Sequence, residues 1–299
     1  NVHQGNTFQD VLHTIQTMCK PICETTQDKG VGLWFSNVAS QEVDTGKLRD
    51  TLQQSGVKLF TLNGFPYSDF HEAVVKHKVY TPNWCTQERL DYTLRLATIL
   101  ADVVDSSDAG ISTVPLGWNN DAFETKDSAR QIQKCIEGLQ EIEHNTGVCV
   151  HLDIETEPGC RLQRSSDLSN FVNTYFGDDE VARRFLRVCH DTCHAAVMHE
   201  TVEDSIDNYK EAGLIIGKVQ LSCAIEVDFT ADTTNQVLED LQSIAEPRYL
   251  HQTTIQDEGE VKFFENLPDV PLENPSGIWR VHYHIPIHAK NFGSLGTTQ

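Results

Sequence analysis

Carboxylate side chains gather at the end of an otherwise aliphatic stretch, residues 148–160 (VCVHLDIETEPGC). Aliphatic residues there alternate with His151, Asp153 and Glu155, and a further acid, Glu157, follows. Because successive side chains of a strand point to opposite faces, one face is aliphatic and the other ends in acids. Glu155 and Glu157 are therefore candidates for acid–base catalysis, and Glu155 also for binding a metal.

The same alternation recurs in four other segments and ends each time near a polar residue. The five strand ends fall near Asn63, Glu155, Asp191, Gln220 and His284. Two carboxylates, an amide oxygen and an imidazole from four consecutive strands suit a divalent ion such as Mn, Zn, Mg or Fe. The pattern predicts a metal site made by Glu155, Asp191, Gln220 and His284, with positions left open for a substrate hydroxyl or carbonyl.

Residues near these strand ends are candidates for catalysis and substrate binding. His194, three residues after Asp191, could contact substrate or move a proton. The loop at residues 61–71 (TLNGFPYSDFH) could cover the barrel mouth as a substrate lid, or it could be a packed loop. Residues 245–252 (AEPRYLHQ) could hold an anionic or hydroxylated substrate, or they could form a salt-bridged loop. The predicted substrate-binding residues are Asn63, Phe65, His194, Arg248, His251 and His3.

A structural interpretation competes with the catalytic one for the inner polar residues. Asp153 could pair with Arg187 or Lys218, and Arg280 could neutralise Glu155 without any ion. We prefer this interpretation for the residues that lie deeper along the strands, which are His151, Asp153, Lys218, Arg280 and His282. For Glu155 and Asp191 we prefer a functional role, because catalytic residues of β/α barrels lie at strand C-termini.

The elements that must position these residues alternate along the chain. The predicted strands cover residues 31–36, 57–66, 110–118, 148–158, 184–194, 214–224 and 277–288. The predicted helices cover residues 45–56, 86–104, 128–147, 166–176 and 233–244, and Thr7 caps an earlier one. Asn1–His3 is interpreted as the end of a first strand, cut short at the start of the chain. Eight β-α units without an early GxGxxG sequence predict an α/β fold of the (β/α)8 TIM-barrel type, as one domain over residues 1–299.

Composition restricts the class of partner. The 299 residues carry a formal net charge of -21, from 44 acidic and 23 basic residues, which disfavours nucleic acid. No apolar run reaches transmembrane length and no leader pattern opens the chain, so we expect no stable membrane insertion. Nine cysteines, an odd number spread along the sequence, favour a reducing, cytoplasmic compartment. The roles of the pairs Cys19/Cys23 and Cys189/Cys193, and the oligomeric state, are left open.

Several longer motifs resemble a known family. They are HLDIETEPGC, VCHDTCH, GKVQLS, EPRYLHQ, WRVHYHIPI, TLNGFPY and STVPLGW. Together they resemble the TIM-barrel protein of the Ebo metabolite-traffic clusters (EboE), within the xylose isomerase-like superfamily. The resemblance covers nearly the whole chain. It implies that family members continue beyond the last residue of this sequence, so we expect a trimmed C-terminus.

The resemblance implies a divalent metal at the barrel mouth and a sugar or other polyhydroxylated substrate. In the epimerase branch a Glu, an Asp, a His and a second acid hold the metal. Glu155 and Asp191 match the first two positions, and His194 matches a substrate-contacting His. Gln220 stands in place of the metal-binding His and His284 in place of the last acid, which puts the metal identity and the proton transfer in question.

Three hypotheses follow. The first is a metal-dependent isomerase or epimerase acting on a polyhydroxylated metabolite, linked to metabolite trafficking. The second is a non-catalytic protein that binds a metabolite in the same barrel mouth, which the missing second acid favours. The third is an apurinic endonuclease-like nuclease, which the net charge disfavours.

Overall fold

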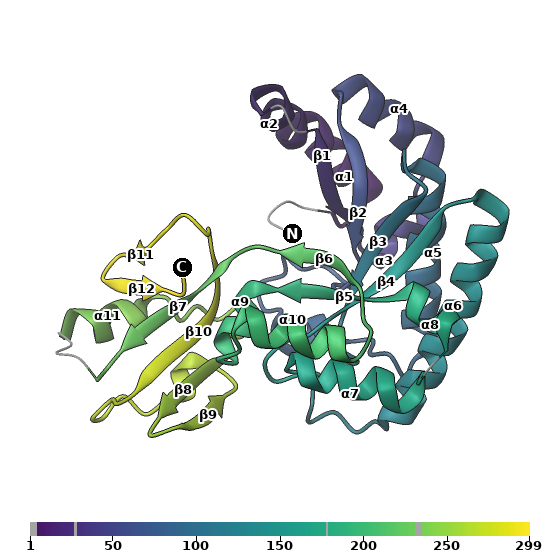
Figure 1. Ribbon diagram of the computed structural model, residues 1–299. Coiled ribbons are helices and arrows are strands. Elements are labelled where there is room, and N and C mark those ends of the chain that lie inside the picture. The colour runs from purple at the N-terminus through teal and green to yellow at the C-terminus, as the bar shows by residue number, and fades with distance from the viewer. Residues whose placement is uncertain (1–4, 27–28, 178, 231–234) are drawn as a thin grey trace.

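A six-stranded parallel sheet carries the N-terminal part of the protein in the computed structural model, which describes residues 5–26, 29–177, 179–230 and 235–299 (Figure 1). Its spatial order follows the sequence, and each neighbouring pair is parallel. The strands are β1 (Gly30–Trp34), β2 (Lys58–Asn63), β3 (Asp108–Thr113), β4 (Cys149–Glu155), β5 (Leu186–Asp191) and β6 (Ile216–Gln220). The strands predicted from residue 31 to residue 194 are thus confirmed.

The parallel sheet is curled, so that strands which are not neighbours approach one another across its inner face. Asp153 of β4 is fully buried there. A Cβ atom added to Gly217 of β6 would lie 2.0 Å from Asp153 Oδ1, and one added to Gly110 of β3 would lie 2.1 Å from Asp153 Oδ2. Strands β4 and β6 are separated by β5, so this approach requires curvature. It places the acidic face of β4 in the interior of the curl.

Helices precede and connect the parallel strands, and the two longest, α5 and α6, pack against one face of the sheet. The helices up to β6 are α1 (Phe8–Thr14), η1 (Ile15–Cys19), α2 (Lys20–Thr25), α3 (Asn37–Gln41), α4 (Thr45–Ser55), η2 (Lys76–Tyr80), α5 (Gln87–Val103), α6 (Thr125–Thr146), α7 (Ser165–Tyr175), α8 (Glu180–Phe185), α9 (Thr192–Val197) and α10 (Val202–Glu211). Their ends follow the sequence signals: Thr7 and Thr86 accept N-cap hydrogen bonds, and α4 and α6 end at left-handed Gly56 and Gly147.

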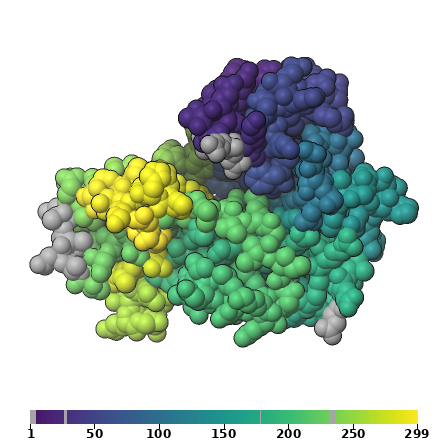
Figure 2. Space-filling view, turned by 45° about the horizontal axis from the view of Figure 1, so that its top comes forward, coloured from purple at the N-terminus to yellow at the C-terminus, as the bar shows by residue number. Residues whose placement is uncertain are grey.

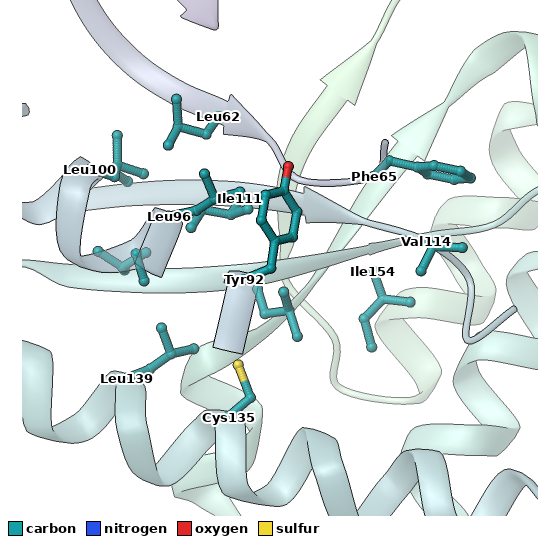
Figure 3. Close-up of a cluster of buried hydrophobic side chains, with 14 of the residues drawn as sticks. Leu62, Phe65, Tyr92, Leu96, Leu100, Ile111, Val114, Cys135, Leu139 and Ile154 are labelled. Carbon is teal, nitrogen blue, oxygen red and sulfur yellow. The ribbon is translucent and has the colours of Figure 1, made fainter. Parts of the chain in front are cut away.

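The main hydrophobic core lies between the sheet and these helices. Figure 3 shows side chains of β2, β3 and β4 packed against α5 and α6, with Ile111 of β3 beside Leu96 of α5. The even-numbered residues of β4 lie in this core and are at most 1% exposed, as the alternation predicted. The odd-numbered acids therefore point to the other face, where the site is built.

The strands that follow β6 in the chain form a second sheet. It is antiparallel and has the order β11-β12-β7-β10-β8-β9. Its elements are β7 (Cys223–Asp228), α11 (Asn235–Ser243), β8 (Thr253–Asp257), β9 (Glu260–Phe264), η3 (Leu267–Asp269), β10 (Ile278–Ile285), β11 (Asn291–Phe292) and β12 (Leu295–Thr297). In Figure 2 its yellow and light green surface lies beside the darker green surface of the segment that precedes it in the chain.

The last two predicted barrel strands differ from the expectation. The segment predicted as one strand over residues 214–224 is divided into β6 and β7, with only Leu221 and Ser222 between them. Parallel neighbours need a crossover of about a dozen residues, so β7 cannot return to the parallel sheet. It pairs antiparallel with β10, the strand predicted over residues 277–288, which therefore does not pair with the parallel sheet.

Three further expectations concern the whole chain. The predicted first strand at Asn1–His3 lies outside the described residues. All nine cysteines lie within the described residues, and none of them forms a disulfide. In the described part of the chain no helix is long and apolar enough to cross a membrane.

Candidate metal and substrate site

Three acids lie at the ends of two parallel strands. Glu155 ends β4, Glu157 follows two residues later, and Asp191 ends β5 and caps α9. All three are at most 5% exposed. Each one accepts hydrogen bonds: Glu155 Oε1 from Gln220 Nε2 at 2.7 Å, Glu157 Oε1 from the Tyr80 hydroxyl at 2.7 Å. Asp191 Oδ1 accepts from the backbone N–H groups of residues 193 and 194 at 2.8 and 3.1 Å, because it stands at the first turn of the helix.

Three imidazoles converge beside these acids. His194 comes from α9 in the parallel part, whereas His282 and His284 come from β10 in the antiparallel sheet. The Nε2 atom of His282 lies 3.0 Å from Nε2 of His194 and also 3.0 Å from Nε2 of His284. The two histidines of β10 reach the same point because residues two apart on a strand share a face.

The other ring nitrogen of each imidazole is held by the protein. Nδ1 of His194 lies 2.8 Å from the Thr156 carbonyl oxygen, Nδ1 of His282 lies 2.7 Å from Gln252 Oε1, and Nδ1 of His284 lies 2.7 Å from the Ser222 hydroxyl. A carbonyl oxygen can only accept, so Nδ1 of His194 carries a proton. Gln252 donates from Nε2 to Glu157 Oε1 at 3.0 Å, which leaves its oxygen to accept from His282. In their neutral forms His194 and His282 therefore turn unprotonated Nε2 atoms toward each other.

Burial keeps these two imidazoles neutral at ordinary pH. Burial lowers the pKa of His194 to about 4, and burial together with the neighbouring His194 and His284 lowers the pKa of His282 well below its ordinary value. Two nitrogen lone pairs 3.0 Å apart repel each other unless a cation lies between them. The arrangement therefore has the chemistry of an ion-binding site.

The donor geometry fits a divalent transition metal. With metal–nitrogen bonds of about 2.1 Å, neighbouring imidazole nitrogens would lie about 3.0 Å apart at right angles and about 3.4 Å apart in a tetrahedron. The two Nε2–Nε2 separations of 3.0 Å match the first of these values. Among the residues that the structure describes, potential ligand atoms within 4.8 Å of one another occur in three groups: Glu157, His194 and His282; Asp191, His194 and His284; and Cys193, His282 and His284.

The three acids differ in pKa because their surroundings differ. Burial, with the neighbouring charges of Asp191 and Glu157, raises the pKa of Glu155 well above its ordinary value. Burial raises the pKa of Glu157 to about 7, although its hydrogen bonds from Tyr80 and Gln252 favour the carboxylate. Burial also acts on Asp191, but the nearby imidazoles and the two backbone N–H groups outweigh it, and its pKa lies below the ordinary value.

Most of the predicted site residues line one cavity of 660 Å³. Those lining it are Asn63, Phe65, Glu155, Glu157, Asp191, His194, Gln220, His251 and His284. Arg248 is not among the lining residues, and its carbonyl oxygen accepts from the backbone N–H groups of Val75 and Lys76. His3 lies outside the described residues.

Two residues have contacts that the sequence interpretation did not include. His282, interpreted as part of a structural layer, lies at the centre of the imidazole cluster. Gln220, interpreted as a metal ligand, uses its amide nitrogen to hold Glu155. The sequence pattern that could have identified His282 as a site residue is the alternation in WRVHYHIP, which places His282 and His284 on one face of a strand. Gln252, Tyr80 and Ser222, which hold site residues, were not singled out from the sequence.

The other four inner polar residues pair with groups of the protein, but with other partners than expected. Asp153 lies 2.6 Å from His151 through Oδ1 and Nδ1. The remaining pairs are Arg187 with Asp108 at 2.9 Å, Arg280 with Glu226 at 2.8 Å, and Lys218 with the Ser112 hydroxyl at 3.0 Å. Arg280 thus neutralises an acid of β7 and not Glu155.

Comparison with solved structures shows the fold class. A D-tagatose 3-epimerase-like protein is similar to this chain with a TM-score of 0.50 and 12% identity, over 83% of this chain and 88% of that one. Two others are the apo form of 3-keto-D-glucoside 4-epimerase, YcjR, from E. coli and a xylose isomerase-like TIM-barrel protein from Mycobacterium smegmatis in complex with magnesium. Their TM-scores are both 0.47, at 11% and 10% identity, over 79% and 82% of this chain and 85% of each of theirs.

The first of these similarities supports the fold class, an α/β fold with a curled parallel sheet. At 12% identity it establishes the fold alone. No protein-family profile matches the chain, and no curated protein sequence matches it.

Proposed function

We propose that this protein is a metal-dependent isomerase or epimerase of a polyhydroxylated small metabolite. One observation carries the proposal: the Nε2 atoms of three imidazoles converge beside buried acids in one cavity. The proposed ligands are His194, His282 and His284. Asp191 is the proposed acid ligand, because its carboxylate and potential ligand atoms of His194 and His284 lie within 4.8 Å of one another. When bound, the ion supplies Lewis acidity to a substrate carbonyl or hydroxyl oxygen.

The protein's own acids supply the proton transfer in this proposal. Isomerisation and epimerisation both break a C–H bond next to a carbonyl and return the proton to another carbon or the opposite face. Glu157 can accept and release a proton near neutral pH, because its pKa is about 7. Glu155, held by Gln220, is the second acid of the same strand end. His194 is then assigned to the ion and not to proton transfer.

A non-catalytic binding protein is the alternative that a specific observation favours. Glu157 is already held by Tyr80 and Gln252, and Glu155 by Gln220, so both acids can serve as fixed acceptors for substrate hydroxyls.

A nuclease fits the cavity less well than either of these functions. Among the described cavity-lining residues Lys76 is the only Lys or Arg, and phosphate backbones need several.

We also propose four more specific properties on the basis of the sequence alone. They are the EboE-type relationship, a link to metabolite trafficking, a cytoplasmic location, and the treatment of residues 1–299 as one domain. The choice among Mn, Zn, Fe and Mg is also a proposal. Three imidazoles favour Zn or Fe over Mg, which prefers oxygen ligands.

Elemental analysis and isotope exchange together test the function. We expect near-stoichiometric metal in the wild type and in His13→Ala, an exposed histidine of α1, and loss of the metal in His282→Ala. In D₂O the metal-loaded protein should exchange the hydrogen next to the carbonyl of a ketose such as D-fructose or D-tagatose, as seen by proton NMR. A wild type that binds none of the four metals would refute the metal site. Bound metal without exchange on any ketose or polyol tested would favour the binding protein.

A further inference from the structure

The cavity around the proposed metal site is larger than its polar end. Its volume of 660 Å³ lies within the range of cavities that take drug-sized ligands. The acids and imidazoles described above form its polar end. A second group of lining residues is apolar and comes from two segments far apart in sequence: Phe65, Phe70, Val75, Val79, Tyr249 and Leu250. We refer to these six residues as the apolar wall.

Hydrogen bonds and ring stacking join the two segments of the apolar wall. The rings of Phe70 and Tyr249 stack with centroids 5.0 Å apart and an interplanar angle of 29°. The Tyr249 hydroxyl donates to the Phe70 carbonyl oxygen at 3.0 Å. Two backbone N–H groups, of Val75 and Lys76, donate to the Arg248 carbonyl oxygen at 2.8 and 3.0 Å. The wall is therefore preformed, and a ligand need not order it.

The apolar wall continues directly into the catalytic end of the cavity. Phe65 packs edge-on against Tyr80 with ring centroids 6.0 Å apart. The Tyr80 hydroxyl in turn donates to Glu157 Oε1 at 2.7 Å. A ligand whose hydroxylated part reaches Glu157 therefore has its next atoms beside Phe65 and the rest of the wall.

The two ends of the cavity select different chemistry. Hydroxyl groups placed against the apolar wall would give up their hydrogen bonds to water without replacement, which is unfavourable. Apolar groups placed there would gain by leaving water. We propose that the substrate is a hydroxylated metabolite carrying an aromatic or aliphatic group, and that the apolar wall binds this group. The inference rests on the proposed function for the role of the polar end, but it concerns the opposite end of the cavity.

Two glucosides that differ only in their apolar part test the inference. The probes are methyl β-D-glucopyranoside and 4-methylumbelliferyl β-D-glucopyranoside, and their dissociation constants are measured by calorimetry or fluorescence. We expect the aryl glucoside to bind about tenfold more tightly or better. Phe70→Ala should remove most of that ratio. Phe60→Ala, which truncates a 55% exposed phenylalanine of β2 that does not line the cavity, should leave the ratio unchanged.

The same measurements separate this inference from the proposed function. The apolar wall contains no proposed metal ligand, so the ratio should persist after the metal is removed with a chelator. Equal affinities for the two glucosides, no binding of either, or a ratio that survives Phe70→Ala would each overturn the inference. Failure of the metal and exchange tests with the ratio intact would overturn only the proposed function. Metal content and circular dichroism of Phe70→Ala check that it folds.

Discussion

Gln252 provides the sharpest test of the metal site, because it acts on an imidazole without being a ligand itself. Its Oε1 accepts from Nδ1 of His282 at 2.7 Å, and its Nε2 donates to Glu157 Oε1 at 3.0 Å and to the Tyr80 hydroxyl at 2.9 Å. It is 1% exposed. Through one amide it fixes the tautomer of a proposed ligand and the position of a nearby acid.

Replacing Gln252 by methionine keeps the size of the side chain and removes both hydrogen-bonding functions. Nδ1 of His282 then loses its acceptor, so the ring can rotate or carry its proton on Nε2, where the metal should bind. Partners of this kind typically contribute about 10- to 100-fold to metal affinity, which corresponds to about 1.4–2.7 kcal/mol. We expect Gln252→Met to weaken Zn²⁺ binding by that amount.

The assay is a competition between the protein and a chromophoric chelator for Zn²⁺ at constant pH. Gln220→Met is the matched control, because Gln220 holds Glu155 and no imidazole. If the three imidazoles bind the metal, the control should change the affinity by less than the Gln252 variant does. A folded Gln252→Met protein with wild-type affinity would refute the role of His282. A larger loss of affinity in Gln220→Met would favour the ligand set predicted from the sequence, which includes Glu155 and Gln220.

Two further predictions concern stability. The pKa of Glu157 is raised from 4.5 to about 7, so the folded protein binds more protons than the unfolded chain between these values, and its stability falls as pH rises through this window. In metal-free protein, Glu157→Gln should remove this loss, which amounts to about 3 kcal/mol at most, and chemical denaturation at pH 5 and pH 8 measures it. Gly217→Ala should lower the free energy of unfolding by about 1–3 kcal/mol, because the new Cβ would lie 2.0 Å from buried Asp153 Oδ1. Gly46→Ala, in the exposed first turn of α4, is the control, and an equal effect of both variants would contradict the crowding argument.

The sequence predicts well those features that are set by local periodicity. The alternation in residues 148–160 identifies β4, assigns Ile154 to the core and Glu155 to the inner face, and the buried packing of β4 follows. Glu155, Asp191 and His284 fall in one cavity because parallel strands end at one edge of a sheet and because β10 reaches the same place.

The sequence does not predict where the chain reverses its direction between two strands, or which residues far apart in sequence come into contact. Residues 214–224 have continuous strand propensity, and no residue type marks the change of direction at Leu221 and Ser222. The contacts that hold Glu157 join it to Tyr80 and Gln252, which are 77 and 95 residues away. Such contacts have no local sequence pattern. For the same reason His282 could be assigned to a face but not to the end of the cavity where it lies.

The proposed ligands come from both sheets, and this has a thermodynamic consequence. His194 and Asp191 belong to the parallel part, and His282 and His284 belong to β10 of the antiparallel sheet. An ion bound by all of them acts as a cross-link whose binding free energy depends on how the two sheets meet. By reciprocity, whatever holds the sheets together raises the affinity for the ion, and the ion opposes their separation by the same free energy. Metal binding and the association of the two sheets would then be thermodynamically linked, so that a change in one changes the other.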